Sequence, residues 1–216
     1  MIKRGIDIAV SLTWLIALSL PLALIAVAIK LESPGPVFFR QRRVGKDGRV
    51  FVIWKFRTMV DGAVNKGLGI TVVKDDDRIT RTGRILRALS LDELPQIINV
   101  LTGDMSLIGP RPTLVHQVEA YTPHQRRRLE VRPGITSWAS VNGRNRLPWE
   151  ERIEMDVWYV DNLSLWLDVK ILFKTLWVAF VTRDGVYAED GANDDFGSKP
   201  PEVPAETTNA GSRTNS

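Results

Sequence analysis

The sequence predicts a mainly α fold with a short β-hairpin (α+β), in which an N-terminal re-entrant membrane helix and interfacial amphipathic helices pack on a small domain. Three observations lead to this prediction. Residues 8–29 are almost continuously apolar, two apolar runs flank a glycine-containing turn at 45–48, and much of the remainder has helical periodicity. At 216 residues, the chain is long enough for one domain with appendages.

The apolar run is about 22 residues long, enough at ~1.5 Å per residue to cross a bilayer. Pro21 predicts a kink in it, and Ser19 is close enough to satisfy part of the freed backbone. Lys and Arg, which prefer the cytoplasmic side, flank both ends of the run. A hairpin that enters and leaves by one face satisfies both flanks, so we predict a re-entrant segment rather than a straight span. The flanking cations are Lys3, Arg4, Lys30, Arg40, Arg42, Arg43 and Lys46.

The remaining elements follow from turn signals and periodicity. Residues 37–59 predict two strands around the turn at 45–48, and residues from 184 onward are too polar to fold and predict a disordered tail. We therefore expect an anchor at 1–36, a domain at 37–183 and a tail at 184–216. Helices are predicted at 83–88, 91–101, 113–129 and 163–181. The last helix fits either a core-facing or a membrane-surface position, and Trp158, Trp166 and Trp177 near it suit an interface.

Composition restricts the kinds of site. The chain has no cysteine, which excludes disulfides and thiolate metal sites, and only His116 and His124 could supply imidazole, so we expect no zinc site. From Ala188 onward six acids face two bases, a net charge of −4, which leaves +8 on the rest of a chain with net charge +4. A basic body suits lipid headgroups or nucleotide phosphates, and without a recognisable nucleic-acid-binding motif we expect no nucleic-acid partner.

Residues 90–96 hold the strongest chemical signal. Asp92 and Glu93 are adjacent at a predicted helix start, where the first N–H groups lack partners and the local potential is positive. A carboxylate there stays ionised and can act as a nucleophile, and the same end can bind a phosphate. Ser90 and Glu93 also fit a capping box, a purely structural role that leaves Asp92 unexplained. Four arginines approach the pair at three-residue steps: Arg78, Arg81, Arg84 and Arg87.

Eight segments in order carry a resemblance to a known family. They are Lys3–Asp7, Ser33–Gln41, Lys55–Met59, Ser90–Gln96, Gly103–Pro112, Arg132–Thr136, Asn142–Asn145 and Asp156–Val160. Together they resemble the bacterial sugar transferase family, the small monotopic polyprenyl-phosphate phosphoglycosyl transferases, over nearly the whole chain before the tail. Three departures are seen: Leu20 separates Ser19 from Pro21, which are usually adjacent, Ser137 replaces a glycine, and Ser140 replaces a glutamine.

The resemblance implies transfer of a phosphosugar from a nucleotide diphosphate sugar, expected to be a UDP-sugar, to polyprenyl (undecaprenyl) phosphate, with release of the nucleoside monophosphate. Such a reaction initiates exopolysaccharide, capsule, O-antigen or glycoprotein glycan assembly. Asp92 matches the nucleophile that forms a covalent phosphosugar intermediate, and Glu93 matches its partner glutamate. Both are expected to bind magnesium, with manganese as a substitute. The polar positions around the acid pair are matched by Lys55, Arg87, Arg111, Arg144 and Asp156.

The resemblance also implies a location and a set of partners. It suggests a monotopic protein of the bacterial inner (cytoplasmic) membrane, with its active site on the cytoplasmic face. Nucleotide sugar, polyprenyl phosphate and membrane lipids are the expected partners. The sugar, the final glycan and the oligomeric state, including a homodimer, are left open.

Two other functions fit parts of the sequence. Asp75 and Asp77 have the Asp-x-Asp spacing that holds a metal in many glycosyltransferases, which release a nucleoside diphosphate. Lys74 and Arg78 flank this very short pattern, so a solvated loop explains it better than a metal site. A non-catalytic membrane scaffold is the third interpretation, and it requires the acid pair to be dispensable.

Overall fold

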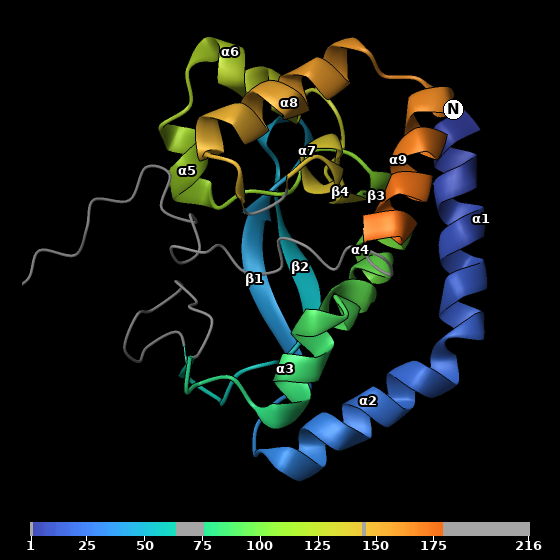
Figure 1. The fold of residues 1–216 in the computed structure, drawn as a ribbon, viewed down its shortest axis with the longest axis vertical. Coiled ribbons are helices and arrows are strands. Elements are labelled where there is room, and N and C mark those ends of the chain that lie inside the picture. Colours follow the sequence, from blue (N-terminus) through green and yellow to red (C-terminus); the bar gives the residue numbers. More distant parts are fainter. Residues whose placement is uncertain (1, 64–75, 144–145, 179–216) are drawn as a thin grey trace, which may run out of the picture.

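The computed structural model describes residues 2–63, 76–143 and 146–178, and these residues are mostly helical (Figure 1). The predicted tail, 184–216, lies outside this part of the chain. The α-helices are α1 (Ile2–Ala17), α2 (Ser19–Glu32), α3 (Arg81–Ala88), α4 (Ile97–Thr102), α5 (Val115–Glu119), α6 (Pro123–Arg126), α7 (Trp138–Val141), α8 (Trp149–Asp161) and α9 (Leu165–Trp177). Short 3₁₀ turns are η1 (Lys46–Gly48), η3 (Leu91–Gln96) and η4 (Arg127–Leu129).

Two small sheets lie among these helices. The antiparallel hairpin of β1 (Phe38–Val44) and β2 (Val50–Phe56) runs through the centre of the molecule, as the sequence predicted (Figure 1). A second sheet pairs β3 (Ser106–Ile108) with β4 (Gly134–Thr136) in parallel. The sequence analysis missed this sheet, because strands of three residues are too short to show alternation.

The N-terminal apolar segment forms two helices that are bent by 62° at Leu18. Pro21 has no N–H to donate to the Ala17 carbonyl four residues before it. Close to this point, the Ser19 hydroxyl donates to the Ile16 carbonyl at 2.8 Å. This geometry matches the predicted kink. Within the described residues, no single helix is long and apolar enough to cross a membrane, although α1 and α2 pass that test as a bent pair.

The first two turns of α1 are bound to the rest of the molecule by polar contacts. Lys3 forms an ion pair with Asp168 on α9 at 2.6 Å. Arg4 donates to the carbonyls of Val100 and Leu101, in the last turn of α4, at 2.5 and 3.0 Å. The buried carboxylate of Asp7 accepts from the Ser106 hydroxyl at 3.0 Å. Figure 1 shows α1 running beside α9 and α4 along one edge of the molecule.

The end of α2 is also bound to the same domain. Ile29 is 3% exposed and packs in a core cluster with Phe56 of β2 and Leu86 of α3. Glu32 accepts hydrogen bonds from the first two N–H groups of α3, at 2.6 and 2.9 Å. Both ends of the bent pair therefore contact one body, while the bend itself lies at the periphery (Figure 1).

Several predicted helix boundaries were wrong. The helix predicted at 113–129 is divided into α5, α6 and η4, because Thr122 and Pro123 start a new helix with their own capping box. The helix predicted at 91–101 begins as η3 and becomes α-helical only at Ile97. Helix α8 was missed, although Pro148 followed by Glu150 and Glu151 in its first turn is a helix-start signal.

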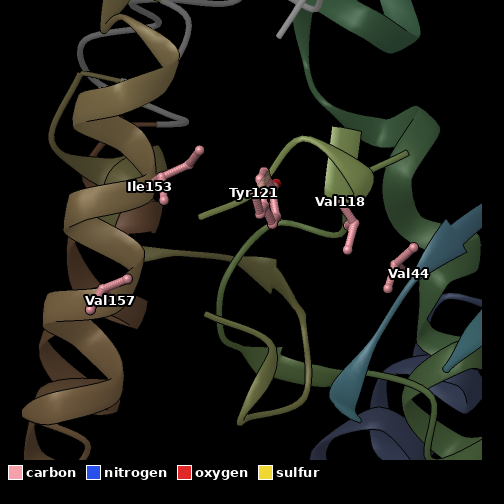
Figure 2. Close-up of a cluster of buried hydrophobic side chains, with 5 residues drawn as sticks. All are labelled: Val44, Val118, Tyr121, Ile153 and Val157. Carbon is pink, nitrogen blue, oxygen red and sulfur yellow. The ribbon is translucent and has the colours of Figure 1, made fainter. Parts of the chain in front are cut away.

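The core is divided into small clusters rather than one large layer. Figure 2 shows the cluster that joins β1, α5, the residue Tyr121 and α8. Its members are Val44, Val118, Tyr121, Ile153 and Val157. This packing fixes α8 against the end of the hairpin that is distant from α2.

Helix α9 turns most of its apolar residues outward. Leu167, Asp168 and Ile171 face the protein, whereas Trp166 is 70% and Phe173 67% exposed. A core-facing position for its apolar side is therefore wrong. An exposed apolar side with interfacial aromatic residues is instead the pattern of a helix at a membrane surface.

Gly83 provides a test of the packing of α3. An alanine Cβ there would lie 2.0 Å from the Thr58 carbonyl oxygen, a backbone atom that cannot move away cheaply. Alanine normally favours a helix over glycine by about 1 kcal/mol, but overpacking costs about 1–3 kcal/mol. We expect Gly83→Ala to lower the thermal unfolding temperature in detergent. The matched Gly5→Ala change meets no atom within 4 Å and should leave this temperature unchanged or raise it; equal shifts for both variants would contradict the packing argument.

Candidate active site

The acid pair lies in the sharp connection between α3 and α4. Ser90 has φ 55°, a left-handed conformation that turns the chain from α3 into η3, and Asp92 and Glu93 occupy the first turn of η3. The Ser90 side chain makes no capping hydrogen bond to η3. The capping-box interpretation is therefore wrong, because the Glu93 side chain points to cations from other elements rather than back to the backbone.

Two cations hold the Glu93 carboxylate. Lys55 of β2 donates to Oε1 at 2.9 Å, and Arg111, which follows β3, donates to Oε1 at 2.6 Å and to Oε2 at 3.3 Å. The Glu93 side chain is 14% exposed and that of Lys55 17%, whereas Arg111 is 50% exposed. The arrangement is a half-buried carboxylate between an ammonium and a forked guanidinium.

The two acids differ in their protonation tendencies. Burial alone would raise the pKa of Glu93, but Arg111 and Lys55 outweigh it and hold this pKa well below its ordinary value. Burial raises the pKa of Asp92, with Glu93 adding to the rise and Lys55, Arg87 and Arg111 opposing it. Burial thus disfavours the charged form of Asp92, and the three neighbouring cations support it.

Of the four arginines in the three-residue series, Arg87 is the one whose charge opposes the rise in the pKa of Asp92. Its Nε donates to the Thr58 hydroxyl at 2.8 Å, which orients the guanidinium near the acid pair. Arg78 is instead buried against Asp76, and Arg81 and Arg84 are exposed. Every-third-residue spacing drifts around a helix with 3.6 residues per turn, so the series does not form one face.

Asn99 aligns β2 with the acid pair and was missed by the sequence analysis. Its side-chain amide donates to the Val52 carbonyl at 2.8 Å and its carbonyl accepts from the Trp54 N–H at 3.0 Å. These two hydrogen bonds join α4 to the backbone of β2 next to Lys55. They thereby fix the position of Lys55 relative to Glu93. The available signal was a buried asparagine in the apolar run that forms α4.

Asp156 lies in a different environment from the acid pair. It is 2% exposed on α8 and forms an ion pair with Arg128, and in the described part of the chain it has no hydrogen bond or ion pair with Asp92 or Glu93. Burial raises the pKa of Asp156 to about 6, although Arg128 opposes the rise. Arg144 lies outside the described residues, so its position in the site stays a prediction.

The donor set at the acid pair fits magnesium. The described residues contain no group of three His, Cys, Asp or Glu side chains that could enclose a metal. Magnesium, however, is usually held by one or two carboxylates together with substrate phosphates and water, and Asp92 and Glu93 offer two adjacent carboxylates.

The rival metal motif receives less support. Asp76, its central residue, is 5% exposed and ion-paired with Arg78 at 2.6 Å. Asp77 is exposed, and Asp75 lies outside the part of the chain that the structure describes. The run is therefore partly used for a structural ion pair.

The sequence is similar to known sugar transferases. A family model described as bacterial sugar transferase matches residues 1–182. The sugar transferase EpsL of Bacillus subtilis (strain 168) is 47% identical over 82% of this chain and 86% of that protein. The UDP-glucose:undecaprenyl-phosphate glucose-1-phosphate transferase of Escherichia coli (strain K12) is 44% identical over 85% of this chain. The UDP-N-acetylgalactosamine-undecaprenyl-phosphate N-acetylgalactosaminephosphotransferase of Aeromonas hydrophila is 47% identical over 81% of this chain. The matches cover 41% and 43% of the last two proteins, so this chain corresponds to less than half of their length.

Proposed function

The chain belongs to the bacterial sugar transferase family, and on that premise we propose that it transfers a phosphosugar from a nucleotide diphosphate sugar to polyprenyl phosphate. The observation that carries the proposal is the acid pair Asp92–Glu93, set among Lys55, Arg87 and Arg111 in one half-buried turn. Two carboxylates among three cations suit a diphosphate, because its charge is attracted while one acid remains available to react. The names of the Escherichia coli and Aeromonas hydrophila relatives support a UDP-sugar and undecaprenyl phosphate as the two substrates.

The proposed reaction has two displacements at one phosphorus atom. A carboxylate oxygen of Asp92 attacks the phosphorus that carries the sugar, the bond to the nucleoside monophosphate breaks, and its electron pair leaves with that product. A phosphate oxygen of the polyprenyl acceptor then attacks the same phosphorus, and the bond to Asp92 breaks to restore the carboxylate. Arg111 and Lys55 keep Glu93 ionised and stabilise negative charge near the transferred group.

Asp92 and Glu93 would hold a magnesium ion. When bound, this ion would neutralise diphosphate charge and help the nucleoside monophosphate to leave. Arg111, through two hydrogen bonds, and Lys55, through one, orient the Glu93 carboxylate for this role.

We also propose that the bent pair α1–α2 is re-entrant in the cytoplasmic leaflet of the inner membrane. Its start contacts α4, α9 and β3, and its end contacts β2 and α3, so both ends belong to one domain. A straight span would separate these ends by the thickness of the bilayer. The large exposed side chains between them are apolar: Ile6, Ile8, Leu12, Trp14, Ile16, Leu20, Leu24 and Val27.

The nucleophile is tested by Asp92→Asn. The amide keeps the shape without the charge, so release of nucleoside monophosphate from a UDP-sugar should fall roughly a thousandfold or more while the unfolding temperature is unchanged. The matched control is Asp77→Asn, which removes an exposed carboxylate of the rival motif and should retain activity. Near-normal activity of Asp92→Asn, with deamidation excluded by mass spectrometry, would rule out the covalent step.

Metal dependence gives a second test. Treatment with a chelator should abolish turnover, and added magnesium or manganese should restore it, because both provide a divalent charge for the diphosphate. Unchanged rates in metal-free buffer would exclude metal binding at the acid pair, even if the nucleophile test succeeded.

The topology is tested by single cysteines, since the chain has none of its own. Ile2→Cys and Lys46→Cys alter exposed positions on the two sides of the bent pair. Neither should react with an impermeant thiol reagent until the membrane is opened. Reaction of Ile2→Cys alone in sealed cells would establish a span instead. Replacing both Ser19 and Pro21 by Leu should straighten the helix and move the protein toward that labelling pattern.

A further inference from the structure

The segment that carries Arg111 is held through its backbone carbonyls. Proline at 110 and 112 leaves two of its three residues without an N–H to donate, so its carbonyls are its main anchoring groups. Each of the three consecutive carbonyls accepts a hydrogen bond from a different element. The donors to Pro110, Arg111 and Pro112 are the Gly134 N–H at 2.9 Å, Arg128 at 3.0 Å and Arg43 at 3.2 Å.

Arg128 is the buried member of this set. It is 2% exposed, and besides the Arg111 carbonyl it donates to the Tyr121 hydroxyl at 2.5 Å and to Asp156. Tyr121 belongs to the apolar cluster that also contains Val44 and Val157 (Figure 2). Arg128 therefore connects the firmly packed α8 side of the molecule to the backbone at Arg111.

Stability alone explains this buried ion pair poorly. Removing two charges from water costs several kcal/mol per ion, and a well-packed apolar pair is often as stable or more stable. The pair is also incompletely hydrogen-bonded, since Asp156 Oδ1 and Arg128 Nε have no hydrogen-bond partner among the described residues. A role in positioning accounts for keeping the charge, because the rigid guanidinium fork holds Tyr121, Asp156 and the Arg111 carbonyl in a fixed arrangement.

We propose that Arg128 is a positioning residue for the transfer reaction. By holding the Arg111 carbonyl, it fixes the backbone from which the half-exposed Arg111 side chain reaches Glu93, and Asp156 and Tyr121 hold Arg128 in turn. Arg128 itself is too buried to touch a substrate. The inference rests on the proposed function, and it assigns Asp156 an indirect part in the site, through Arg128, rather than contact with the reacting groups.

The test is a double-mutant cycle that measures nucleoside monophosphate release by Arg128→Gln, Arg111→Gln and the double variant. We expect Arg128→Gln to lower kcat roughly 10- to 100-fold, the range that a misplaced site group produces. In the Arg111→Gln background the same change should cost less than about twofold, because the group that Arg128 positions is already absent. Arg127→Gln is the matched control. Arg127 is adjacent and pairs with Asp161 on the surface, so this variant should retain wild-type activity.

Several results would overturn the inference. Equal losses from Arg128→Gln in both backgrounds would show a general structural effect, and an inconsequential Arg111→Gln would leave nothing to position. If Arg128→Gln does not fold, Arg128→Lys carries the same cycle, because it keeps the charge beside Asp156 but lacks the fork.

A crystal structure of the Arg128 variant separates this inference from the proposed function. Movement of Arg111 beyond 4 Å from Glu93 would support positioning even if the wild type proved inactive with every nucleotide sugar. An unmoved Arg111–Glu93 pair would overturn the inference while the transferase activity stood.

Discussion

The half-buried charge of Glu93 is the interaction on which the arrangement of this molecule depends. A carboxylate in this position stays ionised only if cations compensate for its lost hydration, and the two that do so lie 38 and 18 residues away in the sequence, at Lys55 and Arg111. The hairpin, the 3₁₀ turn and the segment after β3 must therefore meet at one point. Asn99 secures one of these approaches and Arg128 the other.

This arrangement also separates the tasks of two adjacent acids. Glu93 accepts both direct ion pairs, so Lys55 and Arg111 orient its carboxylate and keep it ionised. Asp92 shares the electrostatic field of these cations and of Arg87, yet it forms no ion pair within the described residues. A carboxylate whose pKa is raised and that is not held in a direct ion pair by the described residues is a better nucleophile than one bound in a salt bridge. The sequence alone cannot show this difference, because it depends on where side chains from other elements end.

Local signals predicted local features well. Glycines around a turn predicted the hairpin, Pro21 with Ser19 predicted the bend, and the acid pair was found from two adjacent carboxylates. Features that depend on distant contacts were missed or wrong: the Ser90 capping box, the arginine series and the β3–β4 sheet. The motifs identified Asp156 but not its partner, because Arg128 lies in a run of three arginines whose members differ only in burial. The predictions for Arg144 and for the tail fall on residues that the structure does not describe.

The bent pair α1–α2 and the acid pair are connected through hydrogen bonds to α3 and α4. Helices α3 and α4 flank the turn that carries Asp92, and each has its outer end capped by a residue of the bent pair. Glu32 accepts from the first N–H groups of α3, and Arg4 donates to the last carbonyls of α4, so each charge also complements the dipole of its helix. On the proposed re-entrant topology, the depth and tilt of α1–α2 in lipid would set the height of Asp92 above the bilayer. A polyprenyl phosphate is confined to the headgroup level, so this capping would keep the nucleophile within reach of an acceptor that cannot leave the membrane.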